Sequence, residues 1–474
     1  MSRSTRRGFV KGSLGAGFLL IAGTKASGNF FGANERVRVA IAGLNGRGGS
    51  HLDEFSKIEG CEIAYLVDPD TRVFRKREKK LAEVGAKPQL VQDIRKVLDD
   101  KNVDAVTIAT PNHWHALMTI MACQAGKDVY VEKPCSHNIR EGRMAVEIAK
   151  KHGRVVQHGT QSRSSGGWEK VAAASASGKL GKVLVSRGLC YKSRKSIGTK
   201  EPTSAPPEVD FNLWLGPARQ QPFHENLVHY NWHWFWDTGN GDIGNQGVHE
   251  MDKARWMIPN ATLPKSVISV GGRFGYKDQG ETPNTQIAIF DYGDTQLIFE
   301  VRGLETEKYH NQGVGNVLHT EAGVVEGTKF IPTGSKEAAA LPEVQAKRPG
   351  TGGIFQNFIN AVRSRKREEL HADILEGHYS SALCHLANAS YRVGEQAPFN
   401  AKTKAFGDNK YAYEALERMG DHLKANNVPI DGLTYQVGKK LTIDAKTELT
   451  DDARANEILR GSYRAPFMLP ERIA

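Results

Sequence analysis

Two polar runs, each placed directly after a predicted strand, carry side chains that are suited to moving protons. They are Thr110-Pro111-Asn112-His113-Trp114-His115 and Glu132-Lys133-Pro134. In a parallel sheet the carboxyl ends of the strands open onto one ligand crevice, so Asn112, His115 and Lys133 are expected to face a shared space. A lysine directly after a buried strand must reach water, a partner or a ligand. A plain surface lysine at a strand end is the alternative.

These runs belong to one predicted strand–helix–strand unit. Residues 104–109 are apolar and β-branched, residues 113–125 have helical spacing, and residues 128–131 form a second apolar strand. A predicted helix over residues 139–152 and a strand over residues 154–157 follow. This alternation of strands and helices predicts an α/β domain with a parallel sheet.

A glycine-rich turn follows the first predicted strand, residues 37–42. It reads Gly43-Leu44-Asn45-Gly46-Arg47-Gly48-Gly49, and a predicted helix begins within it. Glycines let the backbone approach a pyrophosphate, which the free amides and dipole of the helix favour. The usual G-x-G-x-x-G fingerprint has a glycine where this chain has Asn45, although the remaining glycines keep the turn permissive. The predicted dinucleotide contacts are Gly43, Asn45, Gly46, Arg47 and Gly48.

The next predicted strand, residues 63–67, indicates which dinucleotide is preferred. It ends in Asp68, at about the 20-residue distance where a carboxylate binds the ribose 2′-hydroxyl and repels a 2′-phosphate. Asp68 therefore favours NAD over NADP, although Arg72 nearby weakens the preference. A helix cap is the alternative role for Asp68.

A later run is rich in aromatic residues. It reads Tyr230-Asn231-Trp232-His233-Trp234-Phe235-Trp236-Asp237, and Asn245 and His249 lie shortly after it. Sugars present apolar C–H faces beside hydroxyl groups, so aromatic rings next to polar groups suit a sugar. The candidate substrate residues are Tyr191, Trp234, Trp236, Asp237 and Asn245. Core packing is the alternative for each tryptophan. His229 and His233 stand four apart, but no nearby acid or cysteine completes a set, so no metal site is predicted.

These motifs together resemble the Gfo/Idh/MocA family, named after glucose-fructose oxidoreductase and inositol dehydrogenase. The resemblance covers nearly the whole chain after residue 33 and rests on the glycine turn, the two polar runs and the run ending at His249. It implies an N-terminal Rossmann domain and a C-terminal α/β domain with a large open, mostly antiparallel sheet. Family members mostly oxidise or reduce secondary alcohols of sugars, inositols and related polyols with NAD or NADP.

The resemblance also implies roles for single residues. Asn112 and His115 would border the nicotinamide ribose, Glu132 would contact the cofactor, and Lys133 would hydrogen-bond the reacting hydroxyl; Thr110 completes this cofactor-binding group. His249 matches the histidine of the family's Asp-x-Gly-x-His run, whose first position is Asn245 here. Because an amide cannot exchange a proton at neutral pH, proton transfer falls to Lys133 and His249.

Four segments are expected along the chain. Residues 1–33 contain a twin-arginine export signal around Arg6-Arg7 and a linker, and residues 34–158 form the NAD-binding domain. Residues 159–400 form the substrate and oligomerisation domain, and residues 401–474 form an extension that packs on this domain or on a neighbouring subunit. Because the twin-arginine route carries folded proteins, the protein is expected in the periplasm or outside the cell, with its cofactor loaded before export.

Composition narrows the class of partner. The net charge is +11, but five basic residues lie in the first 33 residues, which contain no acid, so the rest carries +6. The remaining basic residues are scattered, which disfavours a nucleic-acid surface, and no segment is long enough for a membrane span. The five cysteines lack Cys-x-x-Cys spacing and indicate neither a disulfide framework nor a zinc site. Alternating strands downstream predict a partly exposed sheet, which self-association into a dimer or tetramer would cover.

Three functions fit these features. The leading hypothesis is an exported oxidoreductase with tightly bound NAD that acts on a secondary hydroxyl of a sugar or glycoside. The first alternative is an NAD-dependent glycoside hydrolase that oxidises C3 transiently and eliminates the aglycone, with Tyr191, His229 and His233 as candidate bases. The second alternative is a non-catalytic sugar-binding protein.

Overall fold

The computed structural model describes residues 36–82, 86–345, 350–399 and 404–471 of the chain. Both sheets belong to one compact unit that begins at Val37. The predicted twin-arginine signal lies outside the described residues.

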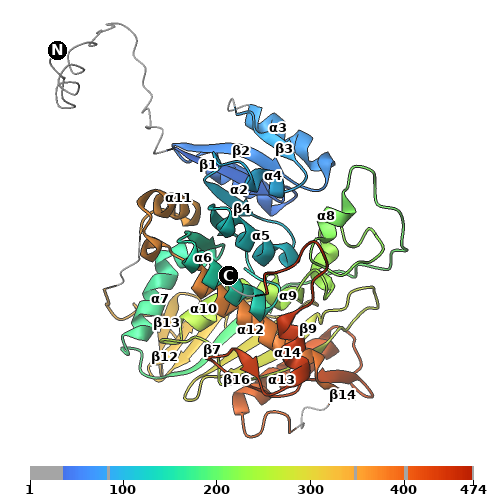
Figure 1. Ribbon diagram of the computed structural model, residues 1–474. Helices are drawn as coiled ribbons and strands as arrows, with labels where there is room; N and C mark the ends of the chain where they lie inside the picture. Colours follow the sequence, from blue (N-terminus) through green and yellow to red (C-terminus); the bar gives the residue numbers. More distant parts are fainter. Residues whose placement is uncertain (1–35, 83–85, 346–349, 400–403, 472–474) are drawn as a thin grey trace, which may run out of the picture. The chain divides into compact units, whose positions relative to one another are not determined.

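A six-stranded parallel sheet forms the first domain (Figure 1). Its order is β3-β2-β1-β4-β5-β6, so the direction of winding reverses between β1 and β4, at the switch point where such sheets bind ligands. The strands are β1 (Val37–Ala42), β2 (Cys61–Val67), β3 (Gln89–Val91), β4 (Ala105–Ile108), β5 (Asp128–Val131) and β6 (Val156–His158). The helices are α2 (Arg47–Phe55), α3 (Phe74–Ala82), α4 (Arg95–Leu98), α5 (Asn112–Gln124) and α6 (Ile139–Lys151), with a short 3₁₀ helix at Thr71–Val73.

A larger mixed sheet forms the second domain. Along the order β13-β12-β11-β7-β10-β9-β8-β15-β14, only β7 and β10 pair in parallel. The strands are β7 (Val183–Tyr191), β8 (Ser266–Gly272), β9 (Thr285–Asp291), β10 (Gln296–Arg302), β11 (Val314–Thr320), β12 (Gly323–Glu326), β13 (Lys329–Pro332), β14 (Glu395–Pro398), β15 (Thr434–Val437), β16 (Leu441–Asp444) and β17 (Leu449–Thr450). This architecture confirms the predicted fold class of a Rossmann domain and an α/β domain with a mostly antiparallel sheet.

Helices of the second part of the chain connect and cover these strands. They are α7 (Gly166–Ala176), α8 (Phe211–Leu215), α9 (Gly241–Gly244), α10 (Gly247–Trp256), α11 (Ile354–Ser364), α12 (Ile374–Arg392), α13 (Lys410–Ala425) and α14 (Ala453–Arg460), with 3₁₀ helices at Gln161–Ser164, Asn231–Trp234 and Arg367–Glu369. Helix α11 packs on β1 and α2, so the chain returns to the first domain after building most of the second.

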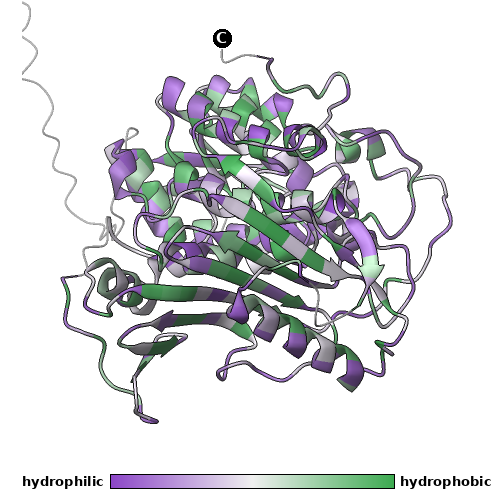
Figure 2. Ribbon diagram, turned by 90° about the horizontal axis from the view of Figure 1, so that it is seen from below, coloured by the Kyte–Doolittle hydropathy of each residue, from purple (hydrophilic) through white to green (hydrophobic). Residues whose placement is uncertain are grey.

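Helices cover apolar residues on both faces of the larger sheet. Its strands are largely green in the hydropathy view of Figure 2. Helices α10 and α12 pack on one face, whereas α13 packs on alternate residues of the other face, among them Val185, Ile287 and Ile298. Helix α13 therefore covers part of the sheet that was predicted to be partly exposed, around the central strands β9 and β10. Oligomerisation itself stays a prediction.

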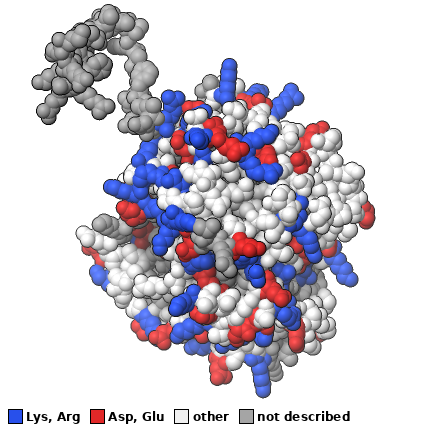
Figure 3. Space-filling view, viewed as in Figure 1, with Lys and Arg blue, Asp and Glu red and all other residues white. Residues whose placement is uncertain are grey.

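The described surface is mixed in charge. Lysine and arginine side chains are interspersed with aspartate and glutamate on the face drawn in Figure 3. Among the described residues, no helix combines the length and the apolar character that a bilayer span requires.

We predict that Leu416→Ala destabilises the protein strongly. Leu416 of α13 is fully buried against the sheet, so its truncation removes apolar contacts and leaves a cavity. The free energy of unfolding should fall by about 2–5 kcal/mol, measured by urea unfolding followed by circular dichroism. Exposed Glu417 on the same helix provides the control, and Glu417→Ala should change stability by less than about 0.5 kcal/mol. Equal stabilities for the two variants would contradict the packing described.

Candidate active site

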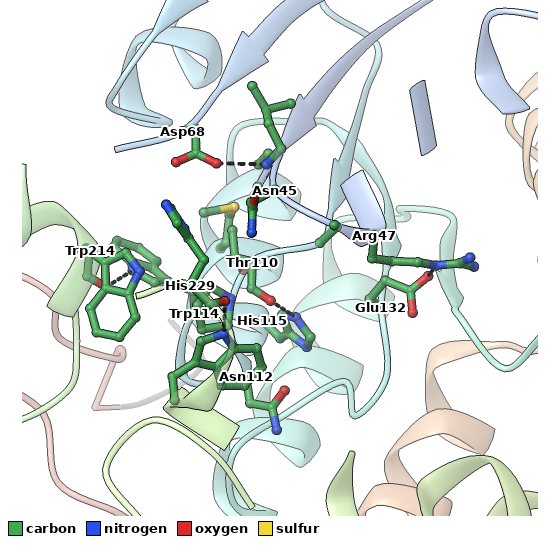
Figure 4. A pocket seen from close by; sticks show the side chains of 18 of the residues that line it. Asn45, Arg47, Asp68, Thr110, Asn112, Trp114, His115, Glu132, Trp214 and His229 are labelled. Atoms are coloured by element: carbon green, nitrogen blue, oxygen red, sulfur yellow. Dashed lines mark hydrogen bonds and ion pairs between the residues drawn. The ribbon is translucent and has the colours of Figure 1, made fainter. Parts of the chain in front are cut away.

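A cavity of about 410 Å³ opens at the carboxyl edge of the parallel sheet. Figure 4 shows it from close by, with Arg47 and Glu132 on one side and Trp214 on the other. Residues of the second domain complete its wall. The predicted site residues that line it are Gly43, Asn45, Gly46, Arg47, Asp68, Thr110, Asn112, His115, Glu132, Lys133, Asn245 and His249. The structure thus brings most of the predicted site residues together around one space.

The glycine turn has the shape that a dinucleotide requires. Gly43 and Gly46 adopt φ values of +83° and +65°, which L side chains rarely tolerate. A Cβ on Gly48 would lie 1.7 Å from the Gly43 carbonyl oxygen, so only glycine fits beneath the turn. Helix α2 begins at Arg47 with no capping side chain and no acid in its first turn. Its N terminus is therefore free to hold a pyrophosphate.

Asp68 supports this turn from the end of β2. Its carboxylate accepts hydrogen bonds from the Leu44 and Asp70 amides at 2.8 and 3.0 Å. Burial raises the pKa of Asp68 to about 6, although these backbone hydrogen bonds oppose the rise. Each carboxylate oxygen keeps a lone pair that can accept a ribose hydroxyl. A helix cap was the alternative role for Asp68, but Asp70 fills that role instead. Asp70 accepts a hydrogen bond from the Arg72 amide at the start of the 3₁₀ helix Thr71–Val73.

An ion pair between a partly exposed arginine and a buried carboxylate joins the turn to the end of β5. Arg47 Nε donates to Glu132 Oε1 at 2.8 Å, and His51 Nε2 lies 3.1 Å from the same oxygen. Burial alone would raise the pKa of Glu132, but the hydrogen bond with His51 and the charge of Arg47 hold it well below its usual range. Glu132 is therefore anionic at neutral pH. The sequence did not single out His51, whose position on α2 carries no motif.

Lys133, the next residue, points across to the second domain. Its Nζ donates to the Asn245 carbonyl oxygen at 2.9 Å. Burial lowers the pKa of Lys133 below the ordinary 10.5, although the charge of Glu132 opposes this. Burial and then the charge of Lys133 lower the pKa of His249 to about 3, and within the described residues its ring makes no hydrogen bond. The cavity therefore holds a lysine that is easier to deprotonate than usual beside a neutral imidazole.

Two residues at the start of α5 fix the wall between the domains. The ring nitrogens of His115 lie 2.8 Å from the Thr110 carbonyl oxygen and 2.5 Å from that of Pro134, so the ring ties the ends of β4 and β5 together. Asn112 Nδ2 donates to Asn240 Oδ1 of the second domain at 3.0 Å.

A loop of the second domain crosses to the first and forms part of the cavity wall. We call residues 203–236 the crossing loop. Its backbone bonds to the first domain, from Thr71 N to Glu208 O at 3.0 Å and from Asp210 N to Pro69 O at 2.9 Å. His229 Nε2 then lies 2.7 Å from Asp70 Oδ2. Trp214, Tyr230 and Trp232 of this loop line the cavity, and none of the three was in the predicted site.

Comparison with known proteins agrees with this geometry. Residues 37–160 match a family described as "Oxidoreductase family, NAD-binding Rossmann fold", and residues 170–423 match "Oxidoreductase family, C-terminal alpha/beta domain". The chain belongs to the Gfo/Idh/MocA family. Its first domain is an NAD-binding Rossmann domain, and the turn, the uncapped helix and Asp68 fit that cofactor.

Individual relatives of this family match over shorter stretches. The chain is 37% identical over 125 residues to "Glycosyl hydrolase family 109 protein 2" of Shewanella sp. (strain ANA-3), which covers 25% of this chain and 27% of that protein. It is 29% identical over 154 residues to "scyllo-inositol 2-dehydrogenase (NAD(+))" of Bacillus subtilis (strain 168). This alignment covers 32% of this chain and 44% of that protein. These alignments thus span less than half of the curated relatives.

Solved structures of similar shape confirm the fold. The WlbA dehydrogenase from Bordetella pertussis, in complex with NADH and UDP-GlcNAcA, superposes with a TM-score of 0.55 at 19% identity, covering 74% of this chain and 96% of that chain. GenD2 from gentamicin A biosynthesis, in complex with NAD, gives a TM-score of 0.51 at 17% identity. The superposition covers 78% of this chain and 97% of that chain.

The remaining five predicted residues of this Gfo/Idh/MocA protein do not line the cavity. Gly48 lies beneath the turn rather than in the lining. Tyr191 donates its hydroxyl to Glu300 within the large sheet at 3.0 Å, and Trp234 is buried with Arg194 over its ring. Trp236 and Asp237 line a second cavity. The aromatic run passes through a 3₁₀ helix, which turns its rings in different directions.

We predict that Gly48→Ala weakens NAD binding at least about tenfold, equivalent to ~1.4 kcal/mol. The added Cβ would overlap the Gly43 carbonyl and push the turn out of shape. Titration calorimetry of cofactor-free protein measures the affinity. Gly166→Ala is the matched control, because a Cβ at Gly166 meets nothing within 4 Å. Equal NAD affinity in the two variants would remove the turn from cofactor binding.

Proposed function

We propose that this protein is an NAD-dependent oxidoreductase that oxidises a secondary hydroxyl of a sugar or glycoside. The observation that carries this proposal is the shared cavity, in which Lys133 and His249 face the space beside a dinucleotide turn. The printed names of the relatives, a glycosyl hydrolase and an inositol dehydrogenase, support a polyhydroxylated substrate.

The residues of the chain then divide the chemistry between them. Bound NAD supplies the acceptor for the hydride that leaves the substrate carbon. Lys133, as the neutral amine, accepts the proton of the reacting hydroxyl, so the alcohol loses two electrons and two hydrogens and becomes a ketone. His249, neutral at pH 7, donates a ring N–H to the oxygen of the same hydroxyl and orients it. The Asn245 carbonyl holds the Lys133 amine in place.

The crossing loop supports tight retention of the cofactor. Its backbone pairing near Pro69 and Glu208, with the contact of His229 and Asp70, holds the loop beside the space that a dinucleotide would occupy. Retention would suit a protein that works outside the cytoplasm, where free NAD is scarce. The twin-arginine run at Arg6-Arg7 supports export to the periplasm or the medium.

The printed name of one relative, a glycosyl hydrolase, supports a second candidate, a redox-neutral glycoside hydrolase. Oxidation at C3 would acidify the C2 proton, elimination would expel the aglycone, and water addition with hydride return would complete hydrolysis. Tyr191, one candidate base, lies outside the cavity lining. His229 and His233 line it, but His229 is held by Asp70, and burial lowers the pKa of His233 to about 3.

A panel of sugars and glycosides tests both candidates on the purified full chain. Nicotinamide absorbance at constant substrate reports net oxidation, and released aglycone reports hydrolysis. The oxidoreductase predicts NADH without aglycone release. Aglycone release with deuterium uptake at C2 and no net NADH would replace it with the hydrolase. Retained NAD without turnover of any compound would instead indicate a sugar-binding protein.

We predict that Lys133→Met lowers kcat/KM at least about a hundredfold while the content of bound NAD stays unchanged. In the wild type, oxidation should rise with pH as Lys133 loses its proton, and the midpoint should lie below 10.5 because burial lowers the pKa of Lys133. His249, with a pKa of about 3, stays neutral across this pH range, so it adds no second inflection to the pH profile of activity. The pH dependence should vanish in the variant.

Exposed Lys195 provides the control, since Lys195→Met makes the same change of side chain outside the cavity lining. Wild-type activity in Lys133→Met, or an unaltered pH profile, would exclude Lys133 as the proton acceptor.

A further inference from the structure

The glycine turn contains a pair of residues, Asn45-Gly46, that is chemically reactive in water. The backbone nitrogen that follows an asparagine can attack the side-chain carbonyl carbon and close a five-membered imide ring. A glycine in the second position leaves this approach open, because it has no Cβ. The sequence holds the same pair once more, at Asn240-Gly241. The two glycines adopt similar φ values of +65° and +70°, so the second pair is a close internal comparison for the first.

The two asparagine side chains differ in how they are held. Asn240 is 5% exposed, its Oδ1 accepts a hydrogen bond from Asn112 at 3.0 Å, and its Nδ2 donates to the His137 carbonyl oxygen at 3.1 Å. Asn45 is exposed and lines the cofactor cavity. Its side chain forms no hydrogen bond with any residue that the structure describes, and Figure 4 shows it directed into the cavity.

The backbone nitrogen next to Asn45 is also without a hydrogen bond. Gly46 precedes the first turn of α2, and its amide donates to no carbonyl or side chain in the described part of the chain. A Cβ at Gly46 would meet nothing within 4 Å, so there is open space around the position where the ring would close. No contact of the folded chain therefore keeps the Gly46 nitrogen and the Asn45 side chain from reacting.

We propose that Asn45 is a site of spontaneous deamidation, through which the cofactor-free protein loses its ability to hold NAD. The Gly46 nitrogen forms a bond to Asn45 Cγ and gives up its proton, the bond between Cγ and Nδ2 breaks, and ammonia leaves. Water then opens the cyclic imide at either of its carbonyl groups and gives aspartate or isoaspartate. The net change exchanges an amide for a carboxylate, consumes one water and transfers no electrons.

The new carboxylate would compete with the pyrophosphate of NAD. Helix α2 has no capping side chain and no acid in its first turn, and an anion is favoured at this end of a helix. A carboxylate at position 45 supplies that anion from the protein and repels the phosphates. Isoaspartate also adds a carbon to the backbone of a turn in which a Cβ on Gly48 would already lie 1.7 Å from the Gly43 carbonyl oxygen. Bound NAD would cover Asn45 and slow its conversion.

Incubation of the full chain at mildly alkaline pH, with and without saturating NAD, tests this site without requiring turnover. Peptide mass spectrometry follows both asparagines in the same sample. Without NAD, Asn45 should convert at least about tenfold faster than Asn240, because Asn240 must first give up its hydrogen bonds. Saturating NAD should slow the conversion of Asn45 about tenfold or more. Titration calorimetry should show that NAD binding falls in proportion to the converted fraction.

Asn45→Asp isolates the effect of the new charge and should weaken NAD binding at least about tenfold. Asn260→Asp is the matched control, because Asn260 is exposed and does not line the cofactor cavity. It should leave NAD affinity unchanged. The proposal is overturned if Asn45 converts no faster than Asn240, if NAD gives no protection, or if Asn45→Asp and the converted protein bind NAD as tightly as Asn260→Asp.

Discussion

The buried carboxylate of Glu132 is the contact on which the arrangement of the site depends. An anion in this position is tolerable only when it is paired. Arg47 and His51 supply the pairing, and both belong to α2. The glycine turn that begins this helix is thereby fixed against the end of β5. Since Lys133 is the next residue, the same pairing sets the lysine beside the dinucleotide turn.

The second domain completes the cavity through polar contacts and through a small hydrophobic cluster that includes Trp214 and Trp232. The Asn245 carbonyl accepts a hydrogen bond from Lys133, and Asn240 accepts one from Asn112. The crossing loop adds backbone pairing at the far edge, next to β2. Cofactor and substrate would therefore occupy a space whose walls belong to both domains. This closure lowers the pKa of Lys133 through burial, and so it also gives the lysine its proposed role.

The sequence predicted those parts that depend on local pattern. Strands 37–42 and 128–131 are confirmed to the residue, because short β-branched runs between turn signals are unambiguous. The cavity residues of the first domain follow strand ends, and topology brings strand ends together. The crossing loop and the cover by α13 depend on contacts distant in sequence, which no local pattern encodes. The directions of the Trp234 and Trp236 side chains depend on a 3₁₀ helix within the aromatic run. The order of residues in the run therefore does not show which ring faces the cavity.

A crystal structure of the full chain with bound NAD tests the central claim most directly. The account predicts a dinucleotide whose adenosine ribose lies near Asp68, whose pyrophosphate sits on the N terminus of α2, and whose nicotinamide faces Lys133 and His249. A nicotinamide ring directed away from both side chains, or a cavity that takes up no dinucleotide, would contradict it.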